Sequence, residues 1–146
     1  MRQLNLGFLA SGRGTNLESV IGAIEQGTVD ARIAVVVCNH ADAAALERAA
    51  RHGIPTATLL QENYSSRLEH QLAIVELLQR YQVELVVMGG WDRILVPEFV
   101  RSFPLRIMNI HPSLLPAFGG KGMVGLHVHK AVLESGAKIS GCTVHF

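Results

Sequence analysis

The sequence predicts an α/β protein with a mostly parallel sheet and helices on both of its faces. Strand-length apolar runs alternate with segments whose apolar residues recur at helical spacing, which is the pattern of repeated βαβ units. The run at 31–39 is apolar almost throughout, as expected of a strand buried on both faces of a parallel sheet. The 146 residues, 49% of them hydrophobic, suffice for one domain with a packed core.

The elements can be predicted in chain order. The first strand is expected at 4–10, before a Gly-rich turn at 11–16. Thr15 and Glu18 have the spacing of a capping box, which begins a helix that ends near Gly27. Asp42 is expected to cap the second helix, and Gly53 to end it. Further strands are expected at 31–39, 54–60, 83–88, 106–111 and 140–146, and further helices at 66–81, 94–103 and 127–134.

The helix at 66–81 carries two local signals. Ser66 and Glu69 form a second capping box at its start. Apolar residues at helical spacing predict the face that it buries, namely Leu68, Leu72, Val75 and Leu78.

The charge balance bears on the class of partner. Thirteen basic and twelve acidic residues give a net charge of +1, so charge favours neither nucleic acid nor a membrane surface as a partner. No apolar run reaches the roughly 20 residues needed to span a bilayer. Cys38 and Cys142 are expected to be reduced thiols. We therefore expect a cytoplasmic protein that acts on small molecules, with an oligomeric state that the sequence leaves open.

The Gly-rich turn at 11–16 is a candidate phosphate site. Gly12 and Gly14 allow a close backbone approach, and the N-terminus of the following helix presents N–H groups to an anion. The turn matches neither the dinucleotide fingerprint nor a Walker A loop. An ordinary strand-to-helix turn is the alternative.

A second candidate site lies at the end of the strand at 106–111. Asn109 and His111 are two residues apart, so their side chains share a strand face, and Pro112 ends the strand. An amide donor beside an imidazole suits attack on a carbonyl group. The alternative is a polar pair that merely satisfies backbone groups.

Two motifs carry a family resemblance. Asn-Ile-His-Pro-Ser-Leu-Leu-Pro at 109–116 resembles the signature of the folate-dependent formyltransferases. Ser-Gly-Arg-Gly-Thr-Asn-Leu at 11–17 resembles the phosphate loop of those members that formylate phosphoribosylglycinamide. The resemblance implies a Rossmann-like formyltransferase fold. It also implies transfer of a formyl group from 10-formyltetrahydrofolate, a co-substrate, to the amine of 5′-phosphoribosylglycinamide in purine (IMP) biosynthesis, without a metal.

The resemblance also implies roles for individual residues. Asn109 would stabilise the oxyanion and His111 would move protons. The ribonucleotide would contact Gly14, Thr15, Asn16, Gly90 and Pro112. The folate would contact Arg67, Asp92, Arg93, Ile94, Leu95 and Asn109. Trp91-Asp92 departs from the Phe-Met common in bacterial relatives, and the loop around Lys121 has no assigned role.

The histidines raise the alternative of a metal site. His127 and His129, taken with His111 and His145, fit no common zinc spacing and have no cysteine partners in sequence. We expect no metal there, and instead expect His129 and His145 to be packed or hydrogen-bonded neighbours of the site.

The sequence ends at Phe146 inside an expected strand. We therefore expect one formyltransferase domain that is incomplete at its C-terminus, with a phosphate-binding half at 1–100 and a catalytic segment at 101–146. The resemblance places a catalytic Asp just beyond Phe146, so the chain alone is expected to be a poor catalyst. Formyltetrahydrofolate deformylase, methionyl-tRNA formyltransferase and a noncatalytic phosphate- or nucleotide-binding module are the alternatives.

Overall fold

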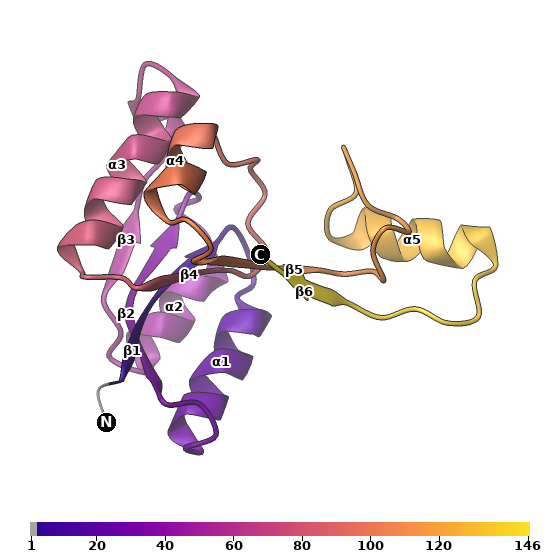
Figure 1. The fold of residues 1–146 in the computed structure, drawn as a ribbon, viewed down its shortest axis with the longest axis horizontal. Helices are drawn as coiled ribbons and strands as arrows, with labels where there is room; N and C mark the ends of the chain where they lie inside the picture. The colour runs from indigo at the N-terminus through magenta and orange to yellow at the C-terminus, as the bar shows by residue number, and fades with distance from the viewer. Residues whose placement is uncertain (1–2) are drawn as a thin grey trace. The chain divides into compact units, whose positions relative to one another are not determined.

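The structure, a computed structural model, describes residues 3–146, which divide into two compact units with a boundary after Ile107 (Figure 1). The first unit contains β1 (Leu4–Ala10), α1 (Thr15–Glu25), β2 (Ala31–Cys38), α2 (Ala44–Arg51), β3 (Thr56–Thr58), the 3-10 helix η1 (Gln61–Asn63), α3 (Arg67–Arg80), β4 (Leu85–Met88) and α4 (Pro97–Ser102). The second contains nearly all of β5 (Ile107–His111), then α5 (Leu126–Ser135) and β6 (Thr143–His145). The division predicted from the sequence, into a phosphate-binding half at 1–100 and a catalytic segment at 101–146, stays a prediction.

The strands of the first unit are all parallel, in the order β3-β2-β1-β4. This arrangement confirms the predicted α/β class with a mostly parallel sheet. Since β1 lies between β2 and β4, the carboxyl ends of these three strands meet at one edge of the sheet. The residues that follow them, Ser11, Asn39 and Gly89, are thereby brought close together, as is usual for ligand sites in open α/β sheets.

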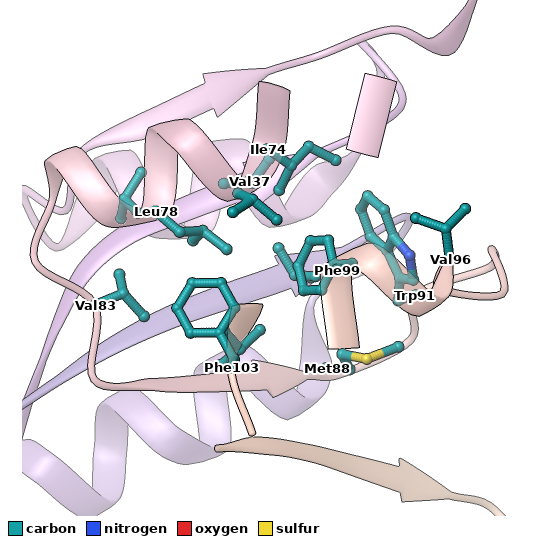
Figure 2. Close-up of a cluster of buried hydrophobic side chains, with 13 residues drawn as sticks. Val37, Ile74, Leu78, Val83, Met88, Trp91, Val96, Phe99 and Phe103 are labelled. Carbon is teal, nitrogen blue, oxygen red and sulfur yellow. The ribbon is translucent and has the colours of Figure 1, made fainter. Parts of the chain in front are cut away.

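Two hydrophobic cores cover the opposite faces of this sheet. Phe8 and Leu9, which are neighbours in β1, belong to different cores because successive strand side chains point to opposite faces. Helices α1 and α2 pack on the side of Phe8, and α3 and α4 on the side of Leu9. Figure 2 shows the core on the side of Leu9, in which Trp91 lies beside Val96 and Phe99.

The buried face of α3 differs from the predicted one. Leu68 and Leu72 are each 41% exposed, whereas His70 and Gln71 are fully buried. The helix is rotated because these two polar side chains bind backbone groups of neighbouring loops: His70 Nε2 donates to the Leu59 carbonyl at 2.9 Å, and Gln71 binds the 94–96 loop. Val75 and Leu78 are buried as predicted.

Of the three caps predicted at helix N-termini, those at Thr15 and Asp42 are wrong. Gly14, in the left-handed conformation, is the N-cap of α1 and makes no side-chain cap bond, so Thr15 is already helical. Ala43 precedes α2, and Asp42 caps nothing. Ser66 does cap α3 by accepting from the Glu69 N–H at 3.1 Å. The Glu69 carboxylate returns to Ser65 instead of Ser66, so this capping box is only half formed.

The second unit is built on an antiparallel ladder. Asn109 pairs with His145 and His111 with Thr143, which confirms strands at both predicted places. Helix α5 confirms the helix predicted at 127–134, and it ends at Gly136, which is in the left-handed conformation.

The structure bears on the expected state of the cysteines and on membrane-spanning helices. Cys38 is buried, Cys142 is exposed, and both are free thiols. Among residues 3–146, no helix is both long and apolar enough to cross a membrane.

Candidate active site

The Gly loop of the first unit leads directly into α1. Gly14 has φ +70°, and a Cβ there would lie 2.7 Å from the Ala45 Cα, so both conformation and packing demand glycine. The first intrahelical bond runs from the Glu18 N–H to the Gly14 carbonyl at 3.0 Å. The N–H groups of Thr15 and Asn16 precede that bond, so they are free of helical partners and suited to an anion.

Helix α2 supports this loop from behind. The Ala45 N–H donates to the Gly12 carbonyl at 3.0 Å, and Arg48 Nε donates to the Arg13 carbonyl at 2.7 Å. Arg48 Nη1 also donates to Glu18 Oε2 at 3.0 Å. The hydrogen bond from Arg48, assisted by His52, lowers the pKa of the Glu18 carboxyl. Arg48 thus ties the loop to both α1 and α2, a role that sequence reasoning missed because no local pattern marks it.

Asp92 occupies the centre of the edge formed by β1, β2 and β4. Its carboxylate accepts from Ser11 Oγ at 3.0 Å, Asn39 Nδ2 at 2.7 Å and His40 Nε2 at 2.8 Å. Burial raises the pKa of this carboxyl, but the three hydrogen bonds outweigh burial and leave the pKa below its usual value. Both carboxylate oxygens thus bind side chains of this unit: two donors share Oδ1 and one reaches Oδ2.

The stretch after Asp92 is shaped by a buried amide. Gln71 is fully buried, donates from Nε2 to the Ile94 carbonyl at 2.9 Å, and accepts from the Val96 N–H at 2.7 Å. The amide thereby fixes the backbone on both sides of Leu95. The Ile94 side chain is 73% exposed, and Arg93 and Arg67 are also exposed.

The second unit places Asn109 and His111 on one strand face. Asn109 Nδ2 donates to His145 Nε2 at 3.2 Å, and His111 Nε2 donates to the Phe118 carbonyl at 3.0 Å. Because a carbonyl only accepts, this contact places a proton on Nε2 of His111 and leaves Nδ1 as the basic nitrogen of the neutral ring. His145 is therefore a hydrogen-bonded neighbour, as predicted, whereas His129 is exposed and not packed.

The loop that follows β5 is held by Thr143. Thr143 Oγ1 donates to the Ser113 carbonyl at 2.7 Å and accepts from the Leu115 N–H at 3.0 Å. Ser113 Oγ in turn donates to the Ala117 carbonyl at 2.6 Å. These contacts fix the backbone just beyond His111 and Pro112. Sequence reasoning assigned no role to Thr143 or Ser113.

Within residues 3–146, no three His, Cys, Asp or Glu side chains are grouped as they would be around a metal ion.

Comparison with known families identifies the class of protein. The model of the formyl transferase family matches residues 4–146. The chain belongs to the formyl transferase family.

Two relatives of this chain have names that specify an enzyme of purine biosynthesis. The phosphoribosylglycinamide formyltransferase of Haemophilus influenzae is 43% identical over 141 residues, which cover 97% of this chain and 64% of that protein. The trifunctional purine biosynthetic protein adenosine-3 of Gallus gallus is 42% identical over 144 residues, but the match covers only 14% of that protein. The chain thus spans less than two thirds of the length of these curated relatives.

Solved structures agree with this assignment. The crystal structure of glycinamide ribonucleotide transformylase 1 from Symbiobacterium toebii superposes with a TM-score of 0.92 at 42% sequence identity. That match covers 99% of this chain and 66% of the solved one. The formyltransferase fold predicted from the two motifs is therefore confirmed.

Proposed function

We propose that this formyl transferase carries a formyl group from 10-formyltetrahydrofolate to the amine of 5′-phosphoribosylglycinamide, in purine biosynthesis. The observation that carries the proposal is the pairing of Asn109 and His111 on one strand face in a chain whose relatives bear this activity in their names. The products are 5′-phosphoribosyl-N-formylglycinamide and tetrahydrofolate.

The proposed mechanism assigns a task to each group. The N–H groups of Thr15 and Asn16, with Gly14, receive the 5′-phosphate at the positive end of α1. The substrate amine attacks the formyl carbon, and the Asn109 amide donates a hydrogen bond to the oxyanion that develops. His111 takes the amine proton through its basic nitrogen and returns a proton as tetrahydrofolate leaves.

The remaining predicted contacts belong to the same proposal. Gly90 and Pro112 would lie beside the glycinamide moiety. The folate would be held by Arg67, Arg93, Ile94 and Leu95, by the Asp92 backbone and by Asn109. The partners are small molecules, no metal takes part, and the location is the cytoplasm.

An assay of the full-length protein tests the function. Tetrahydrofolate release should require 5′-phosphoribosylglycinamide and should fall sharply with glycinamide lacking the phosphoribosyl group. Release of formate to water alone would instead indicate a deformylase, and formylation of methionyl-tRNA the corresponding transferase. Calorimetry in which unrelated nucleotides bind as well as the ribonucleotide would favour a noncatalytic module.

Arg48→Ala tests the support of the phosphate loop. We expect KM for the ribonucleotide to rise about tenfold, because the Arg13 carbonyl loses a charged donor worth about 1.5–3 kcal/mol. KM for the folate should stay within about twofold of the wild-type value, because the hydrogen bonds of Arg48 go to the Arg13 carbonyl and to Glu18. Arg51→Ala, on the exposed face of the same helix, is the matched control. Equal changes in both KM values would contradict a loop-specific role.

Gln71→Met tests the support of the 94–96 loop. The variant leaves the Ile94 carbonyl and the Val96 N–H unpaired, so it should lower the free energy of unfolding by about 1–3 kcal/mol and raise KM for the folate. Gln71→Glu adds a sharper readout. The buried carboxyl of this variant has a raised pKa, and once protonated it can again donate to the Ile94 carbonyl. KM for the folate should therefore fall as the pH is lowered from about 8 to about 6.

The exposed Gln79 of the same helix supplies the control, since Gln79→Met removes an amide that binds no loop. A change in KM for the ribonucleotide alone would show that Gln71 acts elsewhere.

A further inference from the structure

We propose that Asp92 is a positioning residue whose carboxylate holds the phosphate loop and the 90–95 stretch together. The carboxylate thereby sets the affinity for both substrates without itself touching either of them. This inference rests on the proposed function, which assigns one substrate to each segment. Asp92, Ser11, Asn39 and His40 are called the Asp92 cluster below.

The link to the phosphate loop is a reciprocal pair of hydrogen bonds with Ser11. Ser11 Oγ donates to Asp92 Oδ1 at 3.0 Å and accepts from the Asp92 N–H at 3.0 Å. The Ser11 N–H donates to the Gly90 carbonyl at 3.1 Å. Ser11 is the first residue after β1 and lies three positions before Gly14. A shift of Asp92 is therefore transmitted directly to the start of the phosphate loop.

The link to β2 comes from Asn39 and His40. Asn39 is only 6% exposed, and its amide donates to Asp92 Oδ1 at 2.7 Å, while its own Oδ1 is buried without a hydrogen-bond partner. His40 Nε2 lies 2.8 Å from Asp92 Oδ2. Asp92 thus joins the carboxyl ends of β1 and β2 to the segment that follows β4, and it is the acceptor that all three donors share.

The position of Asp92 is itself fixed on its N-terminal side. Trp91 is 8% exposed and lies in the core beside Val96 and Phe99 (Figure 2). Gly90 has φ +76° and binds Ser11 through its carbonyl. The indole holds the chain before Asp92, and Gln71 holds the backbone at 94 and 96. The hydrogen bonds of the Asp92 carboxylate tie the segment between these two anchors to the ends of β1 and β2, so their loss is expected to loosen that segment.

The charges facing Asp92 are few. His40 and Arg93 are the two basic side chains in contact with its carboxylate among the described residues, with Arg93 Nε 3.5 Å from Oδ1. Both basic side chains are partly exposed, His40 by 39% and Arg93 by 46%, and both carboxylate oxygens are engaged. Replacement of Asp92 by a neutral apolar side chain of similar size therefore removes the acceptor that the three donors share, and it also removes a carboxylate neighbour of Arg93.

Asp92→Met in the full-length protein is the main variant, because methionine accepts none of the three hydrogen bonds. We expect KM for the ribonucleotide and KM for the folate each to rise about tenfold, the loss expected for one or two charge-assisted hydrogen bonds. The change in kcat should be smaller, since the proposed mechanism gives the Asp92 carboxylate no part in the transfer of the formyl group. Asp92→Asn should recover most of both values, because its carbonyl accepts from Ser11 and Asn39 and its amide can donate to His40 Nε2 in the tautomer that carries the proton on Nδ1.

Ser11→Ala provides a second test within the cluster. It should raise both KM values in the same direction as Asp92→Met, whereas Glu98→Gln, which removes an exposed carboxylate paired with Arg101 at 2.7 Å, should change neither. A rise confined to KM for the folate in Asp92→Met would overturn the proposal and make Asp92 a folate contact.

Hydrogen exchange separates this proposal from the function on which it rests. Amide exchange in Asp92→Met should accelerate at both 11–16 and 90–95, and return toward the wild-type rate in Asp92→Asn. Unchanged exchange at 11–16 would overturn the positioning role even if the wild-type enzyme formylates the ribonucleotide. Accelerated exchange in both segments of a protein without that activity would support the coupling and reject the proposed function.

Discussion

Replacing His111 with alanine is expected to lower kcat for formyl transfer by about 10²–10⁴, the range for loss of a general acid or base. The imidazole is the proposed proton carrier, and its Nε2 contact with the Phe118 carbonyl at 3.0 Å leaves Nδ1 as the base. Both KM values should change little, because the proposed phosphate and folate contacts remain. Steady-state kinetics of the full-length protein, with each substrate varied in turn, would measure this effect.

Two further measurements make the His111 prediction specific. Added imidazole should restore part of the lost rate in His111→Ala, since it can occupy the vacated volume and carry the proton. Lys130→Ala on the exposed surface of α5 is the control for a change in the same unit. A kcat within tenfold of the wild-type value would reject His111 as the proton carrier and with it the mechanism proposed above.

Replacing Asn109 with alanine should lower kcat by about 10²–10³, the usual cost of losing one oxyanion donor. The amide is held by its contact with His145 at 3.2 Å, so it is oriented before the substrate arrives. Asn109→Asp should be at least as damaging, because a carboxylate repels the developing negative charge. Binding of the ribonucleotide, measured by calorimetry, should be nearly unchanged in both variants.

The matched control for Asn109 lies on the partner strand. Val144 is 56% exposed and pairs with Ile110, so its side chain belongs to the opposite strand face from that of Asn109. Val144→Ala should leave kcat near the wild-type value. Loss of ribonucleotide binding in Asn109→Ala without a fall in kcat would identify Asn109 as a binding group and not an oxyanion donor.

Local patterns in the sequence predicted those features that depend only on neighbouring residues of the same element. The strand at 31–38 is apolar because both sheet faces are covered, and that signal needs no knowledge of its neighbours. The period of two that places Asn109 and His111 on one face is a property of any extended chain. Gly27 and Gly53, which were expected to end the first two helices, follow α1 and α2 in the left-handed conformation for the same reason, since each acts on its own backbone.

Predictions failed where a side chain had more than one possible partner. Glu18 stands at capping-box spacing from Thr15, yet its carboxylate binds Arg48, which lies 30 residues further along the chain. Leu68 and Leu72 have the right spacing for a buried stripe, but His70 and Gln71 are buried instead because backbone groups of other loops need their hydrogen bonds. In each case a distant contact outweighed a local propensity.

The sequence by itself determined the α/β class, nearly every strand and helix, the Gly loop before α1, and the shared face of Asn109 and His111. Only the tertiary structure revealed the support behind these features: Arg48 under the phosphate loop, Gln71 under the 94–96 loop, and the carboxylate of Asp92 between β1, β2 and β4. The reason is the range of the interactions. Periodicity reports which way a side chain points along its own element, whereas Ser11 and Asp92 are 81 residues apart in sequence and become neighbours only when parallel strands bring their carboxyl ends to one edge.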